Sequence, residues 1–484
     1  VVDRPGWVAG NALAILISGS GRRVAMSFDG DETAAPQLHV EYALNARPPR
    51  IDRFDVPTVP VRAGQPVVMS WSVADPDGGP LGCTLDVGDD GVTEYEFADC
   101  QAVPKQLHEH GTVGSSYVRL TVSDEDGNTT SSVAVFVVSA SDLDWPSERI
   151  HIFYYPWYGN PSFDLERSGT NREGWRHWQQ AFGGTSRKPP EDIGSNFYPS
   201  LGAYSSSDPS VIDQHMQWIS EIGIGVAVVS WWGQGSWEDL LIPAVLDGAQ
   251  AHGVRVAFHL EPYTGVTTNS LINDIAYIYE RYGSHPAFYW VERSTQYGPS
   301  TAPRGVFYVF DTLRAGSEAE WRATLDGIRG TDHDAFVVSQ QFSSNPIEDG
   351  HFDGVYTYGV LDGEGTSWSN FNNRISASGV FSPSVGPGFD ETRAVIGSTR
   401  QRSREGGLRY DSLWSRAIAS GSEWISITSF NEWHEGTQIE PAVPKQILGY
   451  EYESYEGAYG LSGENAEHAY LTRTRFWVGE ELVK

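Results

Sequence analysis

Two glutamates near the end of the chain, Glu432 and Glu435, are the residues whose type and spacing best suit chemistry. They follow an apolar, β-branched run, residues 424–430, which predicts a buried strand. If the chain then turns helically, side chains three apart share one face, with Cβ atoms about 5–6 Å apart. Two carboxylates in a partly dry pocket do not readily ionise together, so one holds a proton while the other is charged, as a general acid and a general base require. The alternative is a surface turn with two solvated glutamates, but the intervening Trp433 and His434 favour the functional interpretation.

A parallel α/β architecture is expected to position this pair. From residue 150 onward, apolar runs alternate with stretches whose apolar residues recur at helical spacing, such as 211–222 and 271–282. Eight such runs predict the strands of a (β/α)₈ barrel: 151–155, 226–230, 254–259, 305–310, 335–339, 354–358, 380–385 and 424–429. The active site of such a barrel lies at the carboxyl ends of its strands.

Aromatic and polar residues do follow these strands. Besides the two glutamates, the candidate substrate-binding residues are Tyr154, Tyr158, Trp231, Trp232, His259, Glu261, Tyr263, Tyr358, Asn431, Trp433 and His434. Any one of them could instead be a core residue, but their common position after strands favours a site. Aromatic rings around carboxylates suit a sugar better than a phosphate or a peptide. There is no glycine-rich phosphate loop and no His-Glu-x-x-His pattern, so neither cofactor nor metal is expected.

The first 140 residues have a different, all-β pattern. Residues 1–46 alternate as three short strands and resemble the C-terminal part of a jelly-roll-like module appended to secreted bacterial enzymes. Residues 51–140 contain short strands between acidic glycine turns, which predicts an Ig-like sandwich, and the pattern resembles the PKD domain family. The Asp-x-Asp-Gly turn at 75–78 could bind calcium, although such residues also form ordinary turns. The predicted catalytic domain spans 148–484.

Composition and cysteine content limit the number of domains, the possible partners and the location of the protein. At 484 residues, two or three domains are expected. A net charge of −30 disfavours nucleic acid and anionic membranes as partners, and no apolar run approaches a membrane span. The chain begins without Met or an apolar leader, so we expect any signal peptide to be removed or to lie upstream. The only two cysteines, Cys83 and Cys100, predict either a disulfide, which suits a secreted or cell-surface protein, or a pair of buried thiols.

Seven sequence blocks within residues 150–445 together resemble glycoside hydrolase family 99, the endo-acting α-1,2-mannosidases and mannanases. The blocks are 153–159, 192–206, 230–232, 259–263, 285–289, 383–388 and 429–440. The resemblance implies that Glu432 is the base acting on the sugar 2-hydroxyl, which displaces the leaving group and forms a 1,2-anhydro sugar with overall retention. It implies that Glu435 is the acid that protonates the departing oxygen and later activates water. Ordinary retaining enzymes place their carboxylates on opposite sides of the ring, which two glutamates from one loop suit poorly.

The resemblance also indicates the substrate. Trp232 matches a position next to the preceding sugar, and implies mannose rather than glucose there, hence α-mannan or mannose-rich oligosaccharides. We expect a monomer that cleaves internal linkages. The alternatives are a retaining exo-α-mannosidase and a non-catalytic carbohydrate-binding barrel, although a binding protein has no need for the titratable pair Glu432 and Glu435.

Overall fold

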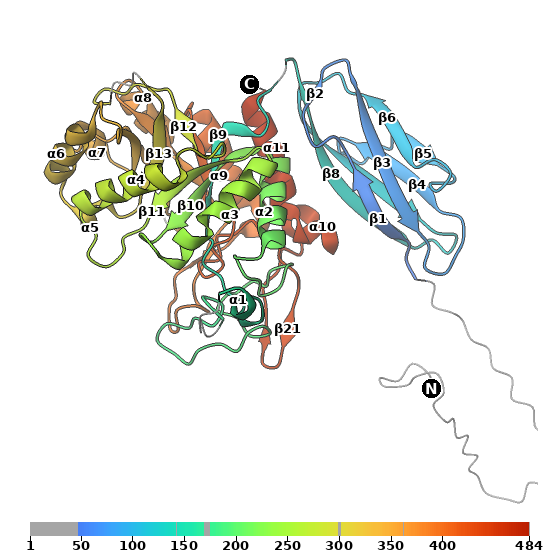
Figure 1. Ribbon diagram of the computed structural model, residues 1–484. Coiled ribbons are helices and arrows are strands. Elements are labelled where there is room, and N and C mark those ends of the chain that lie inside the picture. Colours follow the sequence, from blue (N-terminus) through green and yellow to red (C-terminus); the bar gives the residue numbers. More distant parts are fainter. Residues whose placement is uncertain (1–46, 142, 169–174, 299–301, 362, 484) are drawn as a thin grey trace, which may run out of the picture. The chain divides into compact units, whose positions relative to one another are not determined.

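The computed structural model describes residues 47–483 except 142, 169–174, 299–301 and 362, and residues 48–484 form one compact unit. The strands predicted within residues 1–46 lie outside the described part. Figure 1 shows the chain coloured along its sequence, with β-strands in the first, blue segment and alternating strands and helices after it.

A sandwich of two β-sheets forms the first described segment. One sheet has the order β1 (Arg50–Asp55), β3 (Pro66–Ala74), β6 (Lys105–Glu109). The other has the order β2 (Val61–Arg62), β8 (Thr129–Ser139), β7 (Gly114–Ser123), β4 (Gly82–Val87), β5 (Tyr95–Phe97). Along β3, Met69 and Trp71 are buried while Val68 is exposed, because successive strand residues face opposite sides. The buried face packs against Leu120 and Phe136 of the second sheet.

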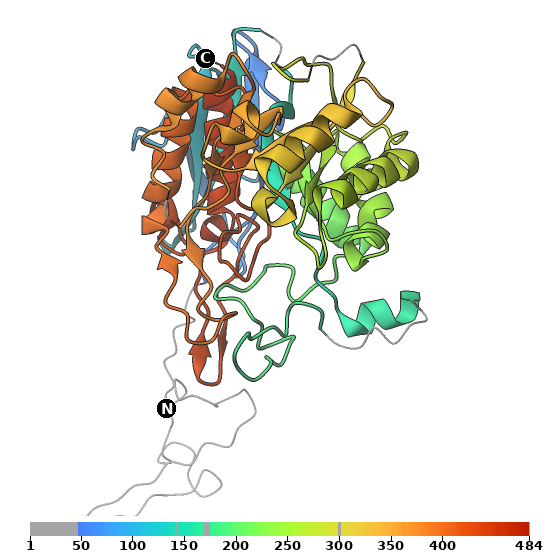
Figure 2. The same cartoon turned by 90° about the vertical axis from the view of Figure 1, so that its left-hand side faces the viewer.

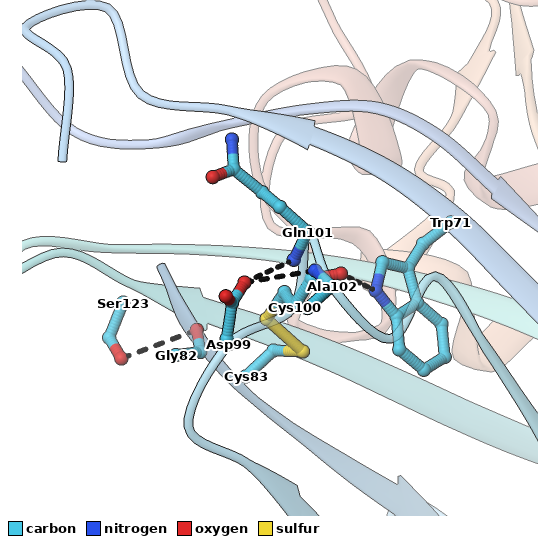
Figure 3. The surroundings of a disulfide bond; sticks show 8 residues. All are labelled: Trp71, Gly82, Cys83, Asp99, Cys100, Gln101, Ala102 and Ser123. Atoms are coloured by element: carbon cyan, nitrogen blue, oxygen red, sulfur yellow. Dashed lines mark hydrogen bonds between the residues drawn. A yellow bond between two sulfur atoms is a disulfide. The ribbon is translucent and has the colours of Figure 1, made fainter. Parts of the chain in front are cut away.

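A disulfide between Cys83 and Cys100 connects β4 to the segment that follows β5 (Figure 3). Both cysteines are buried, and their Cα atoms are 5.7 Å apart. The indole Nε1 of Trp71 donates to the backbone oxygen of Cys100 at 3.1 Å, so the bridge also adjoins the other sheet.

Replacing both cysteines by alanine should destabilise the sandwich by about 3 kcal/mol, because the bridge closes a loop of 17 residues and restricts the unfolded chain. Hydrogen–deuterium exchange read by mass spectrometry should show faster exchange of the β4 and β7 amides, by about 100-fold. Strands of the second segment serve as the internal control. Unchanged protection in β4 and β7 would contradict this expectation.

A parallel barrel forms the second segment. Its strands are β9 (Ser147–Tyr154), β10 (Ile224–Trp231), β11 (Arg255–Leu260), β13 (Arg304–Val309), β14 (Ala335–Gln340), β15 (Gly354–Tyr356), β16 (Val380–Ser382), β17 (Ser384–Val385) and β20 (Ile425–Ile427). β16 and β17 are two parts of one strand, interrupted at Pro383, which has no N–H to donate. β16 pairs with β15 and β17 with β20, so together they close the ring. Each predicted strand overlaps one of these, and the TIM-barrel-like fold is confirmed.

Helices follow most of the barrel strands: α2 (Pro209–Glu221), α3 (Trp237–Ala251), α4 (Thr268–Tyr282), α6 (Glu318–Ile328), α8 (Trp368–Ile375), α9 (Leu408–Ala419) and α11 (Ala469–Leu482). The starts of α2, α3, α4 and α6 are fixed by side-chain caps. Asp208 accepts from the backbone of Ser210 before α2, and Thr267 and Ser317 form capping boxes before α4 and α6. In Figure 2, the green and yellow helices lie to one side and the orange and red ones to the other. Among the described helices, none is long and apolar enough to cross a membrane.

Two apolar layers result from the strand alternation. Phe153, Tyr155 and Tyr308 belong to the layer inside the barrel, whereas Tyr154 and Trp231 belong to the layer between strands and helices. The phase of each strand therefore decides which of its last residues can face a site at the barrel end.

Candidate active site

The carboxylate turn, residues 429–440, begins directly after β20 and closes on itself. The backbone N–H of Ser429 donates to Thr437 at 2.9 Å, and its hydroxyl accepts from the backbone N–H of Glu432 at 2.8 Å. Gly436 has φ of 63°, and a Cβ there would lie only 3.0 Å from the backbone of Asp390, so this position strongly favours glycine. These bonds fix Glu432 and Glu435 at the carboxyl end of the last barrel strand.

Glu432 is buried, with 5% of its surface exposed. The backbone N–H of His434 donates to its Oε1 at 3.1 Å. Burial, and next the charge of Glu435, raise the pKa of Glu432 well above its usual range, and the backbone N–H of His434 opposes this rise. Burial lowers the pKa of His434 to about 4, so its neutral ring supplies no charge to ionise Glu432.

Glu435 is partly buried, and its backbone oxygen accepts from the N–H of Asp390 at 2.6 Å. Burial raises the pKa of Glu435 to about 7; the charge of Glu391 adds to this rise and that of Arg400 opposes it. Because the two glutamates interact, they titrate as a pair that holds a proton near neutral pH. One carboxyl group can therefore donate a proton while the other accepts one.

Glu391→Gln should move the basic limb of the pH dependence of kcat/KM to lower pH. Glu391 pairs with Arg400 at 3.0 Å, so its loss removes a negative charge and leaves a positive one beside Glu435. Both changes favour ionised Glu435 and lower its pKa, so the acid loses its proton at a lower pH, by about half to one unit. Arg400→Met should move the limb the opposite way. Coincident basic limbs for the wild type and both variants would contradict this account.

A third carboxylate, Glu261, lies after β11 and is also buried. Its Oε1 accepts from the hydroxyl of Ser230 at 2.7 Å and lies 3.1 Å from Nδ1 of His259. The same hydroxyl accepts from Nε1 of Trp232 at 3.2 Å, and the Trp232 side chain is 37% exposed. The ends of β10 and β11 thus combine a fixed carboxylate with an open aromatic face.

Two tyrosines adjoin the carboxylates from inside the barrel. The hydroxyl groups of Tyr155 and Tyr358 are hydrogen-bonded to each other, and both rings are buried. Burial, and next the charges of Glu435 and Glu432, raise the pKa of Tyr358 well above its usual range. Tyr155 is not among the predicted site residues, because the sequence does not give the phase of the chain at the end of this strand.

The predictions of Tyr154 and Trp231 as sugar contacts are wrong. Both side chains are fully buried on the helix-facing side, where Tyr154 bonds to Nδ1 of His215 at 3.1 Å and Trp231 donates to Asp239 at 3.0 Å. Each is next in sequence to a residue whose side chain faces the barrel interior, because successive side chains of a strand point to opposite sides.

Other predicted residues support the turn from behind. Asn431, Trp433 and Tyr158 are all fully buried. The Tyr158 hydroxyl donates to the backbone oxygen of Asn431 at 2.9 Å and accepts from the N–H of Trp433 at 3.1 Å. The nitrogen Nε2 of His434 lies 3.0 Å from the backbone oxygen of His177.

Tyr263 is half-buried, and its hydroxyl donates to Asp274 of α4 at 2.5 Å, so this contact directs it toward the helix. Within the described ranges, no group of three or more His, Cys, Asp or Glu is placed to hold a metal ion. The acidic turn of the sandwich is closed by its own bonds, with Asp75 accepting from the N–H of Asp77 at 2.8 Å.

A pair of carboxylates with raised pKa values, one buried and one partly buried, at the carboxyl end of a TIM-barrel-like fold is the arrangement expected of a glycoside hydrolase. The chain belongs to glycosyl hydrolase family 99, whose model matches residues 146–483. It is 37% identical over 375 residues to the glycoprotein endo-alpha-1,2-mannosidase of Xenopus laevis, covering 72% of this chain and 80% of that protein. The enzyme of the same name from Rattus norvegicus is 37% identical over 354 residues, covering 68% and 74%.

A solved structure shows the same similarity. The GH99 endo-alpha-mannosidase from Bacteroides thetaiotaomicron is 34% identical, with a TM-score of 0.61, covering 69% of this chain and 98% of that one. This chain is therefore a glycoside hydrolase.

Proposed function

We propose that the enzyme cleaves internal α-1,2-mannosidic linkages with retention of configuration, by participation of the substrate's own 2-hydroxyl. The observation that supports this most is the placement of Glu432 and Glu435 on one short turn with raised pKa values. Two carboxylates from one turn can serve two neighbouring oxygens of one sugar, O2 and the glycosidic oxygen. The similarity to the endo-alpha-1,2-mannosidases of Xenopus laevis and Rattus norvegicus supports the same linkage, and the similarity to the endo-alpha-mannosidase of Bacteroides thetaiotaomicron supports cleavage within an α-mannoside chain.

The first step forms a 1,2-anhydro sugar. Glu432 removes the proton of the 2-hydroxyl while O2 attacks the anomeric carbon from the face opposite the leaving group. Glu435 donates its proton to the glycosidic oxygen as the bond to the anomeric carbon breaks. The released chain departs with its new hydroxyl, and Glu435 is left ionised.

The second step reverses these roles. Glu435 takes a proton from water as the water oxygen attacks the anomeric carbon and opens the three-membered ring. Glu432 returns its proton to O2. Two displacements at the same carbon give net retention, and both carboxyl groups end in their starting states.

Mannose-rich polymers or oligosaccharides are the proposed substrates. The exposed face of Trp232 offers an apolar surface for a sugar beyond the one cleaved, and Glu261 with His259 offers polar contacts next to it. We assign mannose rather than glucose to the position at Trp232.

We also propose that the enzyme is a bacterial protein that acts outside the cell, and that it is a monomer. The disulfide of the sandwich supports an oxidising compartment. The two-sheet topology and acidic turns of residues 50–139 support a PKD-like spacer.

Digestion of yeast α-mannan tests this function, with products followed by mass spectrometry and by proton NMR at the anomeric position. Oligosaccharides that first appear in the α configuration would support a retaining endo-mannanase. Release of mannose alone would indicate an exo enzyme instead. Binding without cleavage, on both mannan and glucose-capped glycans, would overturn the proposal in favour of a carbohydrate-binding barrel.

A further inference from the structure

Glu440, the last residue of the carboxylate turn, is a carboxylate with no exposed surface. It accepts hydrogen bonds from three side chains: the Tyr204 hydroxyl at 2.8 Å, Nε1 of Trp433 at 2.9 Å and Nε2 of His215 at 3.2 Å. Burying a carboxylate is costly unless it is well hydrogen-bonded. Three converging donors meet that cost here, which marks Glu440 as the centre of a built polar cluster.

The donors connect Glu440 to both catalytic glutamates. Trp433 lies between them in sequence, and its indole N–H is held by Glu440. The Tyr204 hydroxyl, which donates to Glu440, also accepts from Nδ2 of Asn431 at 3.3 Å. Asn431 precedes Glu432 and bonds to the backbone of Tyr155, accepting from its N–H at 2.8 Å and donating to its oxygen at 3.1 Å.

We propose that Glu440 is a positioning residue for the reaction, holding the turn so that Glu432 and Glu435 face the same sugar. This inference rests on the proposed roles of those two glutamates. Glu440 is too buried to touch substrate, so it acts through Trp433 and Asn431. A carboxylate suits this task because it only accepts, whereas an amide would turn an N–H group toward at least one of the three donors.

Asp239 of α3 offers a matched control. It is 2% exposed and also accepts from an indole and from tyrosine hydroxyls, namely Nε1 of Trp231 at 3.0 Å, Tyr282 at 2.8 Å and Tyr277 at 2.7 Å. These donors lie on the helix-facing side of the barrel. Asp239→Asn therefore reproduces the loss of a buried carboxylate without altering the carboxylate turn.

The test compares Glu440→Gln with Asp239→Asn by thermal unfolding, steady-state kinetics on mannan and pH profiles. We expect both to lower the melting temperature, but only Glu440→Gln to lower kcat, by about 10–100-fold, because small displacements of catalytic groups are costly. Its KM should change little, and the limbs of its pH profile should shift because the spacing of the paired carboxyls changes. A wild-type kcat and pH profile in Glu440→Gln would overturn the inference, as would a loss that only equals the unfolded fraction.

Tyr204→Phe covers the case in which Glu440→Gln does not fold. It keeps the carboxylate with two donors and removes the hydroxyl shared with Asn431, so a smaller fall in kcat is expected. Wild-type kcat in this variant would refute the inference. If the wild type itself cleaves no mannan, the proposed function fails; if the wild type is active while Glu440→Gln matches it, only the role of Glu440 fails.

Discussion

Glu435→Gln should lower kcat on mannan by about 10²–10⁴-fold, the usual contribution of a general acid or base. The amide cannot protonate the departing oxygen, although it fills the same space. The pKa of about 7 that burial gives Glu435 keeps much of it protonated near neutral pH, so the wild type has the required acid there. Single-turnover rates on a mannan oligosaccharide, with folding checked by thermal unfolding, provide the measurement.

An activated substrate separates the two roles of Glu435. A mannobiosyl fluoride releases fluoride without needing an acid, so Glu435→Gln should regain most of its first-step rate on it. Azide is an anion that attacks without a general base, so added azide should give a retained mannosyl azide. If the fluoride is hydrolysed as slowly as mannan, and azide gives no product, Glu435 is not the acid and base of this reaction.

Glu432→Gln should also lower kcat by about 10²–10⁴-fold, but on mannan and on the fluoride alike. Its carboxylate is needed to remove the 2-hydroxyl proton in the first step, whatever the leaving group, and azide cannot replace it. The contrast between the two variants is therefore sharper than either loss alone. The matched variant Asp239→Asn controls for the removal of a buried carboxylate.

A 2-deoxy version of the fluoride tests the same step from the substrate side. Without O2 there is no internal nucleophile, so the wild type should fall to the rate of Glu432→Gln. Rapid hydrolysis of the 2-deoxy substrate would show that Glu432 attacks the sugar directly as an ordinary nucleophile.

The sequence by itself determined the alternation of strands and helices in the barrel and the pair of glutamates that follows its last strand. Its apolar runs are long enough for buried parallel strands, and the segments between them have helical periodicity. Few architectures other than a parallel α/β fold are compatible with this pattern. Glu432 and Glu435 were found because their spacing is local and their neighbours are distinctive. Such local patterns can be recognised from the sequence because they depend only on neighbouring residues.

Only the tertiary structure decided which side chains face the site. Adjacent residues such as Tyr154 and Tyr155 differ in role because the strand turns one inward and the other toward the helices, and sequence does not give that phase at a strand end. Glu391, whose charge tunes Glu435, and Tyr204, which bonds Glu440, come from segments remote in the chain. Their effects depend on burial and distance, and these quantities exist only once the chain has folded.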